Sequence, residues 1–154
     1  MKKQPLIYPT YEEQGHENMM VEEPTAIFGT VENRGQVIAR IKEGLPTASF
    51  EKLREEFGVT AAELAKTLNI NMRTLSRRKQ TGRLDTDESE RVYRLARLFQ
   101  IALNLFGDAG LVQRWFSAPK EIFGGLTPLD YADTEPGAQE VEKQLRRLEH
   151  GVFY

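Results

Sequence analysis

Positive charge gathers in one part of this 154-residue sequence. Residues 64–84 hold six lysines and arginines and no acid, a local charge of +6. The windows on either side, 50–63 and 85–90, have net charges of −2 (two basic, four acidic) and −4 (four acidic). Clustered ammonium and guanidinium groups bind phosphate oxygens, so a confined basic window predicts a polyanion site such as a DNA backbone. A solvated helix face with no such partner is the alternative.

The sequence lacks the residues that catalysis and metal or cofactor binding usually need. The chain has no cysteine, which excludes disulfides, iron–sulfur clusters, cysteine-ligated zinc and thiol nucleophiles. Its two histidines, His16 and His150, are far apart in sequence. We therefore expect no catalytic residues, no metal site, no cofactor and no enzymatic activity. No apolar run approaches the roughly 20 residues of a membrane span, so we expect a cytoplasmic protein with no membrane partner.

The basic window fits a helix-turn-helix motif, two short helices joined by a tight turn. Thr60 and Glu63 form a capping box that starts the first helix. Asn69 tolerates the left-handed backbone that the turn requires. Three further positions have the size and polarity that the motif needs: Ala65, Ile70 and Leu75. The second helix, which runs from Met72 through Lys79 and ends near Gly82, would then enter the major groove of DNA.

The second helix supplies side chains suited to reading DNA. Arg73 or Arg77 can fork onto a guanine, and Asn71 can either pair with an adenine or cap its own helix. Arg78 stands where the motif usually has an apolar residue, which either loosens the packing there or frees the side chain for phosphate. The predicted DNA contacts are Asn71, Met72, Arg73, Thr74, Ser76, Arg77, Arg78, Lys79 and Arg83; the last three suit phosphates better than bases.

The rest of the chain is also predicted to be helical, so the expected fold class is all-α. Apolar residues recur with helical period from Arg34 onward, and no stretch alternates with period two for long enough to form a strand. Prolines and glycines interrupt residues 1–33, which we expect to form a poorly structured arm with at most a short strand or turn. The expected division is this arm, a helix-turn-helix region at 34–84, and a small helical domain at 85–154.

The longest predicted helix covers about 20 residues after Asp85. Asp85 and Glu88 form a second capping box at its start. An apolar stripe runs along it: Val92, Leu95, Ala96, Phe99, Ala102, Leu103 and Phe106. The stripe is equally suited to the core of a monomer and to a dimer interface.

Local signals mark several other positions. Ser49 is expected to cap the helix that contains Phe50, and Thr127 to cap a short helix with Pro128 at its first position. Gly137 is expected to interrupt the chain before the last amphipathic helix. Trp115 is expected in the core.

The sequence resembles a known family, the Xre/MbcA/ParS antitoxins. The resemblance rests on the helix-turn-helix, the long helix, and three segments, "FGD…W", "GGLTPLD" and the terminal "LEHGVFY", and covers roughly residues 50–154. It implies an Xre-like DNA-binding region followed by a toxin-binding domain at 85–154. It further implies neutralisation of a RES-class toxin that consumes NAD⁺, and repression of the antitoxin's own operon.

The resemblance also suggests which residues bind the toxin and how. A protruding terminus can occlude an active-site pocket, and the expected contacts are Gly124, Gly125, Pro128, Leu129, Arg147, Glu149, His150, Val152, Phe153 and Tyr154. The expected partners are a RES-type toxin, operator DNA and a second copy of the chain. The alternative function is a stand-alone helix-turn-helix repressor whose second half dimerises or senses a ligand.

Overall fold

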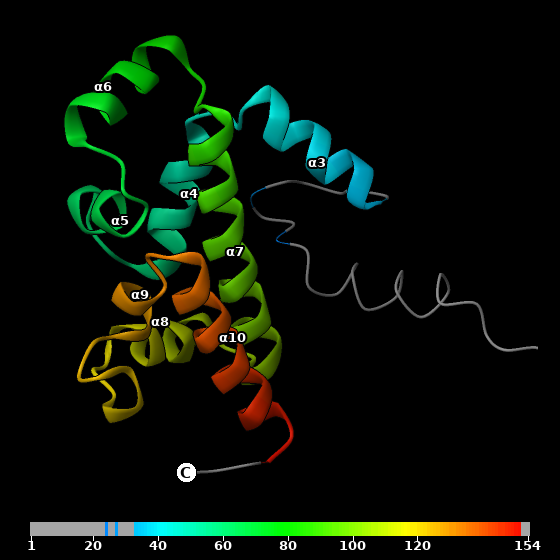
Figure 1. Cartoon of the computed structure of the whole chain (residues 1–154), viewed down its shortest axis with the longest axis vertical. Coiled ribbons are helices and arrows are strands. Elements are labelled where there is room, and N and C mark those ends of the chain that lie inside the picture. The colour runs from blue at the N-terminus through cyan, green and yellow to red at the C-terminus, as the bar shows by residue number, and fades with distance from the viewer. Residues whose placement is uncertain (1–23, 25–26, 28–32, 152–154) are drawn as a thin grey trace, which may run out of the picture.

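A computed structural model describes residues 24, 27 and 33–151 of the chain (Figure 1). Within them every regular element is helical, which confirms the all-α class. The predicted arm lies outside the described residues except for Pro24, Ile27 and Asn33. The helices are α3 (Arg34–Glu43), α4 (Ala48–Phe57), α5 (Ala61–Thr67), α6 (Met72–Thr81), α7 (Thr86–Phe106), α8 (Ala109–Ser117), the 3-10 turn η1 (Glu121–Phe123), α9 (Pro128–Tyr131) and α10 (Glu135–Glu149).

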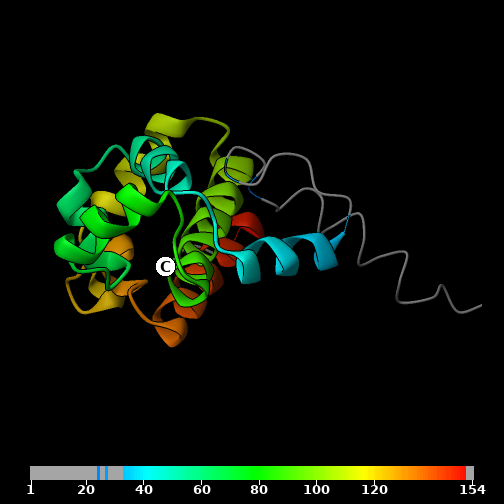
Figure 2. The ribbon, with the colours of Figure 1, turned by 90° about the horizontal axis from the view of Figure 1, so that it is seen from above.

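The long helix α7 is the centre of the structure. It packs against α3 and α4 from the first half of the chain and against α8 and α10 from the second (Figure 1). Seen from above, α3 lies to one side of α7, away from α5 and α6 (Figure 2). The predicted stripe is buried or partly buried, and Leu98 and Ile101, which lie outside it, are buried as well. The stripe of α7 therefore serves the core of the monomer.

Aromatic rings join the two halves of the chain beside α7. The ring of Phe57 on α4 meets the rings of Phe99 and Phe116 edge-on, with centroid separations of 5.1 and 5.0 Å. Each arrangement places a positive ring edge against a negative ring face, which is favourable beyond the area buried. Gln113 on α8 also donates a hydrogen bond of 2.8 Å to the carbonyl of Glu56. Since α7 packs against helices of both halves and these contacts join them, the division between residues 84 and 85 stays a prediction.

Three of the predicted helix starts are confirmed, and two, at Ser49 and Gly137, are wrong. Both capping boxes are present, and Thr127 caps α9 with Pro128 in its first turn. Ser49 does not cap α4. That helix begins at Ala48, after Thr47, two residues before the predicted start at Phe50, and Ser49 is buried in its first turn.

Gly137 does not interrupt the chain before the last helix. It lies inside α10, which begins at Glu135 with Thr134 as its cap. The glycine is buried against the preceding segment, where a Cβ atom would overlap the backbone carbonyl of Tyr131. A close approach between two backbones, rather than a turn, explains why a residue without a side chain stands here.

Ion pairs fasten α10 to α7. Arg94 and Glu135 approach to 2.9 Å, and Arg97 forms a two-pronged pair with Glu142 at 2.7 and 3.0 Å. Burial alone would raise the pKa of Glu142, but its bonds to Arg97 and Arg146 outweigh that effect and the pKa lies below its usual value. The charged form of Glu142 is therefore favoured by the fold.

Among the described residues, no single helix is long and apolar enough to cross a membrane. Helices α7 and α8 meet the criteria of length and composition only when taken together, and a bend of 120° separates them.

Replacing Gly137 by alanine should destabilise the protein by about 1–3 kcal/mol, because the new methyl group must displace the Tyr131 carbonyl. The measurement is the free energy of unfolding from urea titrations followed by circular dichroism. Gln139→Ala, at an exposed position of the same helix, is the control and should change stability by less than about 0.5 kcal/mol. Equal stability of the two variants would contradict the close approach.

The pKa of Glu142 predicts a loss of stability in acid. A carboxyl whose pKa is lower in the folded state stabilises the fold above its unfolded pKa, and this contribution disappears as the pH falls through the folded pKa. Unfolding measured from pH 7 down to pH 3 should therefore show a shallower decline for Glu142→Gln than for the natural chain. Identical slopes below about pH 4.5 would contradict the pairing with Arg97 and Arg146.

Candidate functional site

Helices α5 and α6 form the predicted helix-turn-helix. Asn69 adopts a φ of 53° in the turn, and the amide of Ile70 donates 2.9 Å to the carbonyl of Ala65. Ala65, Ile70 and Leu75 are all buried, as the motif requires. The local geometry of the motif is thus confirmed, and α6 occupies the position of a recognition helix.

The outer face of α6 carries the side chains predicted to read bases. Met72, Arg73, Ser76 and Arg77 are exposed, whereas Thr74 is half-buried. Asn71 is exposed too, and its side-chain oxygen accepts a hydrogen bond of 2.7 Å from the amide of Arg73. The structure thereby gives Asn71 its capping role, and contact with an adenine stays a prediction.

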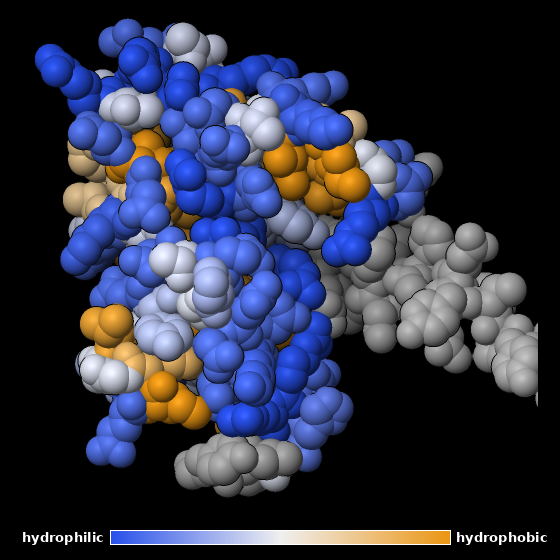
Figure 3. All heavy atoms as spheres, in the orientation of Figure 1, coloured by the Kyte–Doolittle hydropathy of each residue, from blue (hydrophilic) through white to orange (hydrophobic). Residues whose placement is uncertain are grey.

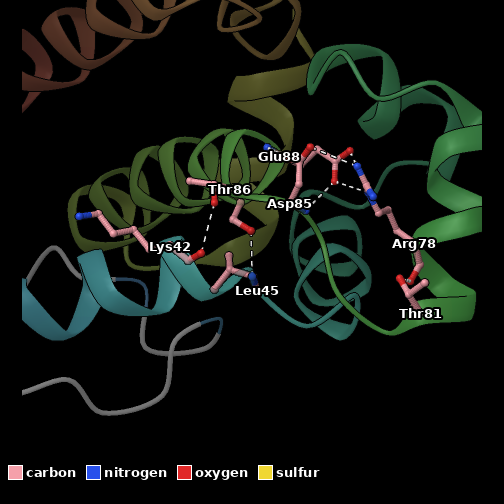
Figure 4. Close-up of polar contacts among 8 residues, drawn as sticks. Lys42, Leu45, Arg78, Thr81, Asp85, Thr86 and Glu88 are labelled. Carbon is pink, nitrogen blue, oxygen red and sulfur yellow. Dashed lines mark hydrogen bonds and ion pairs between the residues drawn. The ribbon is translucent and has the colours of Figure 1, made fainter.

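Arg78 has a different role from its neighbours. Its Nε lies 2.9 and 3.2 Å from the two carboxylate oxygens of Glu88, and a second nitrogen lies 3.1 Å from Asp85 (Figure 4). The Glu88 side chain is only 5 % exposed. Its hydrogen bond to Arg78 is the main cause that raises the pKa of that guanidinium. An ion pair thus replaces the apolar contact that usually ends this helix, and it fixes α6 to the start of α7.

The remaining predicted phosphate contacts are also engaged within the chain. Lys79 pairs with Glu51 at 3.0 Å, and Arg83 donates 2.8 Å to the carbonyl of Gly44. The pKa of Glu51 is lowered by its hydrogen bond to Arg54 and then by the one to Lys79. Phosphate contact by Arg78, Lys79 and Arg83 stays a prediction.

Arg73 and Arg77 differ from those three cations because neither side chain forms an ion pair or a hydrogen bond with any described residue. Both project from the exposed face of the second helix of the motif. An arginine held by a carboxylate has much of its charge compensated, whereas an unpaired one presents its full charge to a phosphate or a guanine. This exposure is compatible with the predicted contacts of Arg73 and Arg77 to bases, which stay a prediction.

The predicted toxin contacts fall into groups with different surroundings. Gly124 and Gly125 form an exposed turn with φ of 65° and 86°, a left-handed backbone that suits glycine. Pro128 and Leu129 are buried, so the structure gives them a packing role. At the end of α10, Arg147 is half-buried, whereas Glu149 and His150 are exposed. Val152, Phe153 and Tyr154 lie outside the described residues.

A cleft of about 440 Å³ lies beside that turn, and the sequence did not predict it. Trp115 forms part of its wall and is half-buried rather than enclosed in the core. The ammonium of Lys120 lies 5.1 Å from the centre of the Trp115 ring, and burial lowers the pKa of this lysine. Gln144 and Leu148 of α10 also line the cleft. Their i, i+4 spacing, which places them on one face of a helix, is the signal in the sequence that relates to it.

Two family descriptions match consecutive parts of the chain. The Antitoxin Xre-like helix-turn-helix domain matches residues 36–97. The Antitoxin Xre/MbcA/ParS C-terminal toxin-binding domain matches residues 102–151, which include the cleft and the glycine turn.

Individual proteins are similar over most of their length. An Antitoxin Xre of Pseudomonas putida is 37 % identical over 117 residues, 75 % of this chain and 72 % of that protein. An Antitoxin Xre of Yersinia enterocolitica is 36 % identical over 129 residues, 82 % of this chain and 87 % of that protein. A Prs ADP-ribosylating antitoxin of a Sphingobium species is 25 % identical over 126 residues, 75 % and 79 % of the two chains. The chain therefore belongs to the Xre/MbcA/ParS family of antitoxins, regulatory proteins that bind DNA and toxins and are not enzymes.

Proposed function

We propose that this antitoxin neutralises a RES-type toxin that degrades NAD⁺, by occluding its active site with the C-terminal region, and that it represses its own operon through α6. The observation that carries the proposal is the presence of both binding regions on one helical body. The recognition helix α6 lies at one end of α7, and the last turn of α10 lies towards the other (Figure 1). Toxin and DNA can therefore be bound at separate surfaces.

The family resemblance and one relative support the proposal that the toxin consumes NAD⁺. The name of the Sphingobium relative, Prs ADP-ribosylating antitoxin, refers to ADP-ribosylation. ADP-ribosyl transfer uses NAD⁺ as its donor, so a cognate toxin of this kind would consume NAD⁺. The match to a toxin-binding domain over residues 102–151 favours this function over a stand-alone repressor.

The same body links the two binding regions physically. The side-chain amide of Asn69, in the turn of the helix-turn-helix, donates a hydrogen bond of 3.1 Å to the carbonyl of Asp133, just before α10.

One recognition helix reads only a half-site, so we propose that the antitoxin binds its operator as a homodimer.

Replacing Arg73 or Arg77 by alanine should weaken binding to operator DNA by about 1–3 kcal/mol if that side chain reads a base. The measurement is an affinity titration against the operator and against scrambled DNA. Arg114→Ala is the control, because it removes an exposed arginine on α8, outside the recognition helix. Affinity should also fall with salt, with a log–log slope of about −0.9 for each neutralised phosphate. A salt-independent affinity, or no effect of either substitution, would contradict the proposed interface.

The occlusion mechanism is tested at the end of the chain. Changing Val152, Phe153 and Tyr154 to serine keeps the chain length but removes the apolar side chains. When the variant and the cognate toxin are expressed together, we expect loss of growth rescue and a fall in cellular NAD⁺. Operator binding measured in parallel should be unchanged, which shows that the variant is folded. Full rescue by the serine variant would refute occlusion by this segment, and toxicity without NAD⁺ loss would refute the RES assignment.

A further inference from the structure

The cleft beside α10 combines an apolar surface with the cation Lys120 and the exposed carboxylate Glu121, which does not pair with Lys120 in the described part of the chain. Trp115, Phe123 and Leu148 contribute apolar surface, and Ile122 and Leu126 at this end of the molecule are each about half exposed (50 % and 49 %). Figure 3 shows hydrophobic residues gathered at this end of the molecule, where η1 and the loop to α9 lie in Figure 1. Exposed apolar residues next to a cleft are typical of a surface that a partner covers.

Lys120 is the feature that defines what the cleft can bind. Its ammonium faces the Trp115 ring at 5.1 Å and forms no ion pair with any residue in the described part of the chain. A half-buried ammonium has lost part of its hydration, and the ring offers only a weak substitute for a carboxylate. The charge of Lys120 is therefore incompletely compensated in the free protein. A partner that brings a carboxylate would compensate it.

We propose that the Trp115–Lys120–Leu148 cleft is a docking groove for a segment of the toxin that presents an apolar side chain next to a carboxylate. The apolar side chain enters between Trp115 and Leu148, and the carboxylate pairs with Lys120. Gln144, on the same wall as Leu148, can hydrogen-bond the backbone of that segment. This groove is proposed as an anchor in addition to the occlusion of the toxin's active site.

The shape of the cleft favours a protein segment over a small molecule. Its volume of about 440 Å³ accommodates a few side chains. Ile122, which lines the cleft, and Leu126, which does not, are both half-exposed and add apolar surface at this end of the molecule. The cleft also lies within the toxin-binding match at residues 102–151. The proposal rests on the proposed function in one respect, the existence of a cognate toxin.

The test measures toxin affinity with substitutions in the groove. Lys120→Glu and Ile122→Asp should each weaken binding to the purified cognate toxin about tenfold or more, because the first reverses the charge and the second places a charge on the apolar rim. Lys120→Arg keeps the cation and should stay close to the natural affinity. Lys143→Glu makes the same charge change at an exposed position of α10 that does not line the groove, and should have little effect.

A second readout uses Trp115, which is the single tryptophan of the chain. Antitoxin containing 5-fluorotryptophan has one fluorine resonance, and toxin binding in the groove should shift it. Operator affinity, measured for every variant, should be unchanged and reports on folding.

The outcomes separate the two proposals. Natural affinity for both groove variants, with no fluorine shift on binding, would overturn the groove and leave the antitoxin function intact. If the natural chain itself fails to bind the toxin, the proposed function fails instead. Weakened toxin binding by Lys120→Glu and Ile122→Asp, with rescue by Lys120→Arg and unchanged DNA affinity, is the result expected for a docking groove.

Discussion

The carboxylate of Glu88 is almost entirely enclosed, and a charged group in that position must be fully bonded or the fold is destabilised. It is bonded in two directions. It accepts a hydrogen bond of 2.9 Å from the amide of Asp85, which caps α7, and it pairs with Arg78 at the end of α6. The neighbouring Ser89 accepts 2.8 Å from the amide of Leu45, which leads out of α3 (Figure 4). One short stretch at the start of α7 therefore sets the position of the recognition helix.

The parts of the fold that the sequence predicts are those with local causes. A capping box needs residues three apart, and a left-handed turn needs one tolerant residue, so Thr60, Glu63 and Asn69 were identified without knowledge of the tertiary structure. The position of Arg78 within the motif is a local signal too, so the sequence marks this residue as unusual. The sequence does not identify its partner, because the pair depends on the angle between α6 and α7, which no local pattern encodes. The error at Gly137 has a similar origin, since its close neighbour, the Tyr131 carbonyl, belongs to another element.

The candidate sites show the same limit. The sequence places Arg73 and Arg77 on the outside of α6 and separates them from Lys79 and Arg83 by position. It does not reveal the partners of Lys79 and Arg83, because Glu51 and the Gly44 carbonyl lie far along the chain. The groove was missed because its walls come from α8, η1 and α10, which only the folded chain brings together. Trp115 was expected in the core for a good physical reason, since a large aromatic residue on an amphipathic helix usually lies inside. Here it is shared between core and cleft.

The continuity of α7 has a consequence for how such antitoxins can be recombined. The two family matches meet inside this helix, one ending at residue 97 and the other beginning at residue 102. Leu98 and Ile101, which lie between them, are buried. A chimera that joins the DNA specificity of one antitoxin to the toxin specificity of another must therefore preserve packing on both sides of the junction, because there is no linker in which to cut. The two family matches occupy separate segments of the chain, but residues of both segments pack in one core.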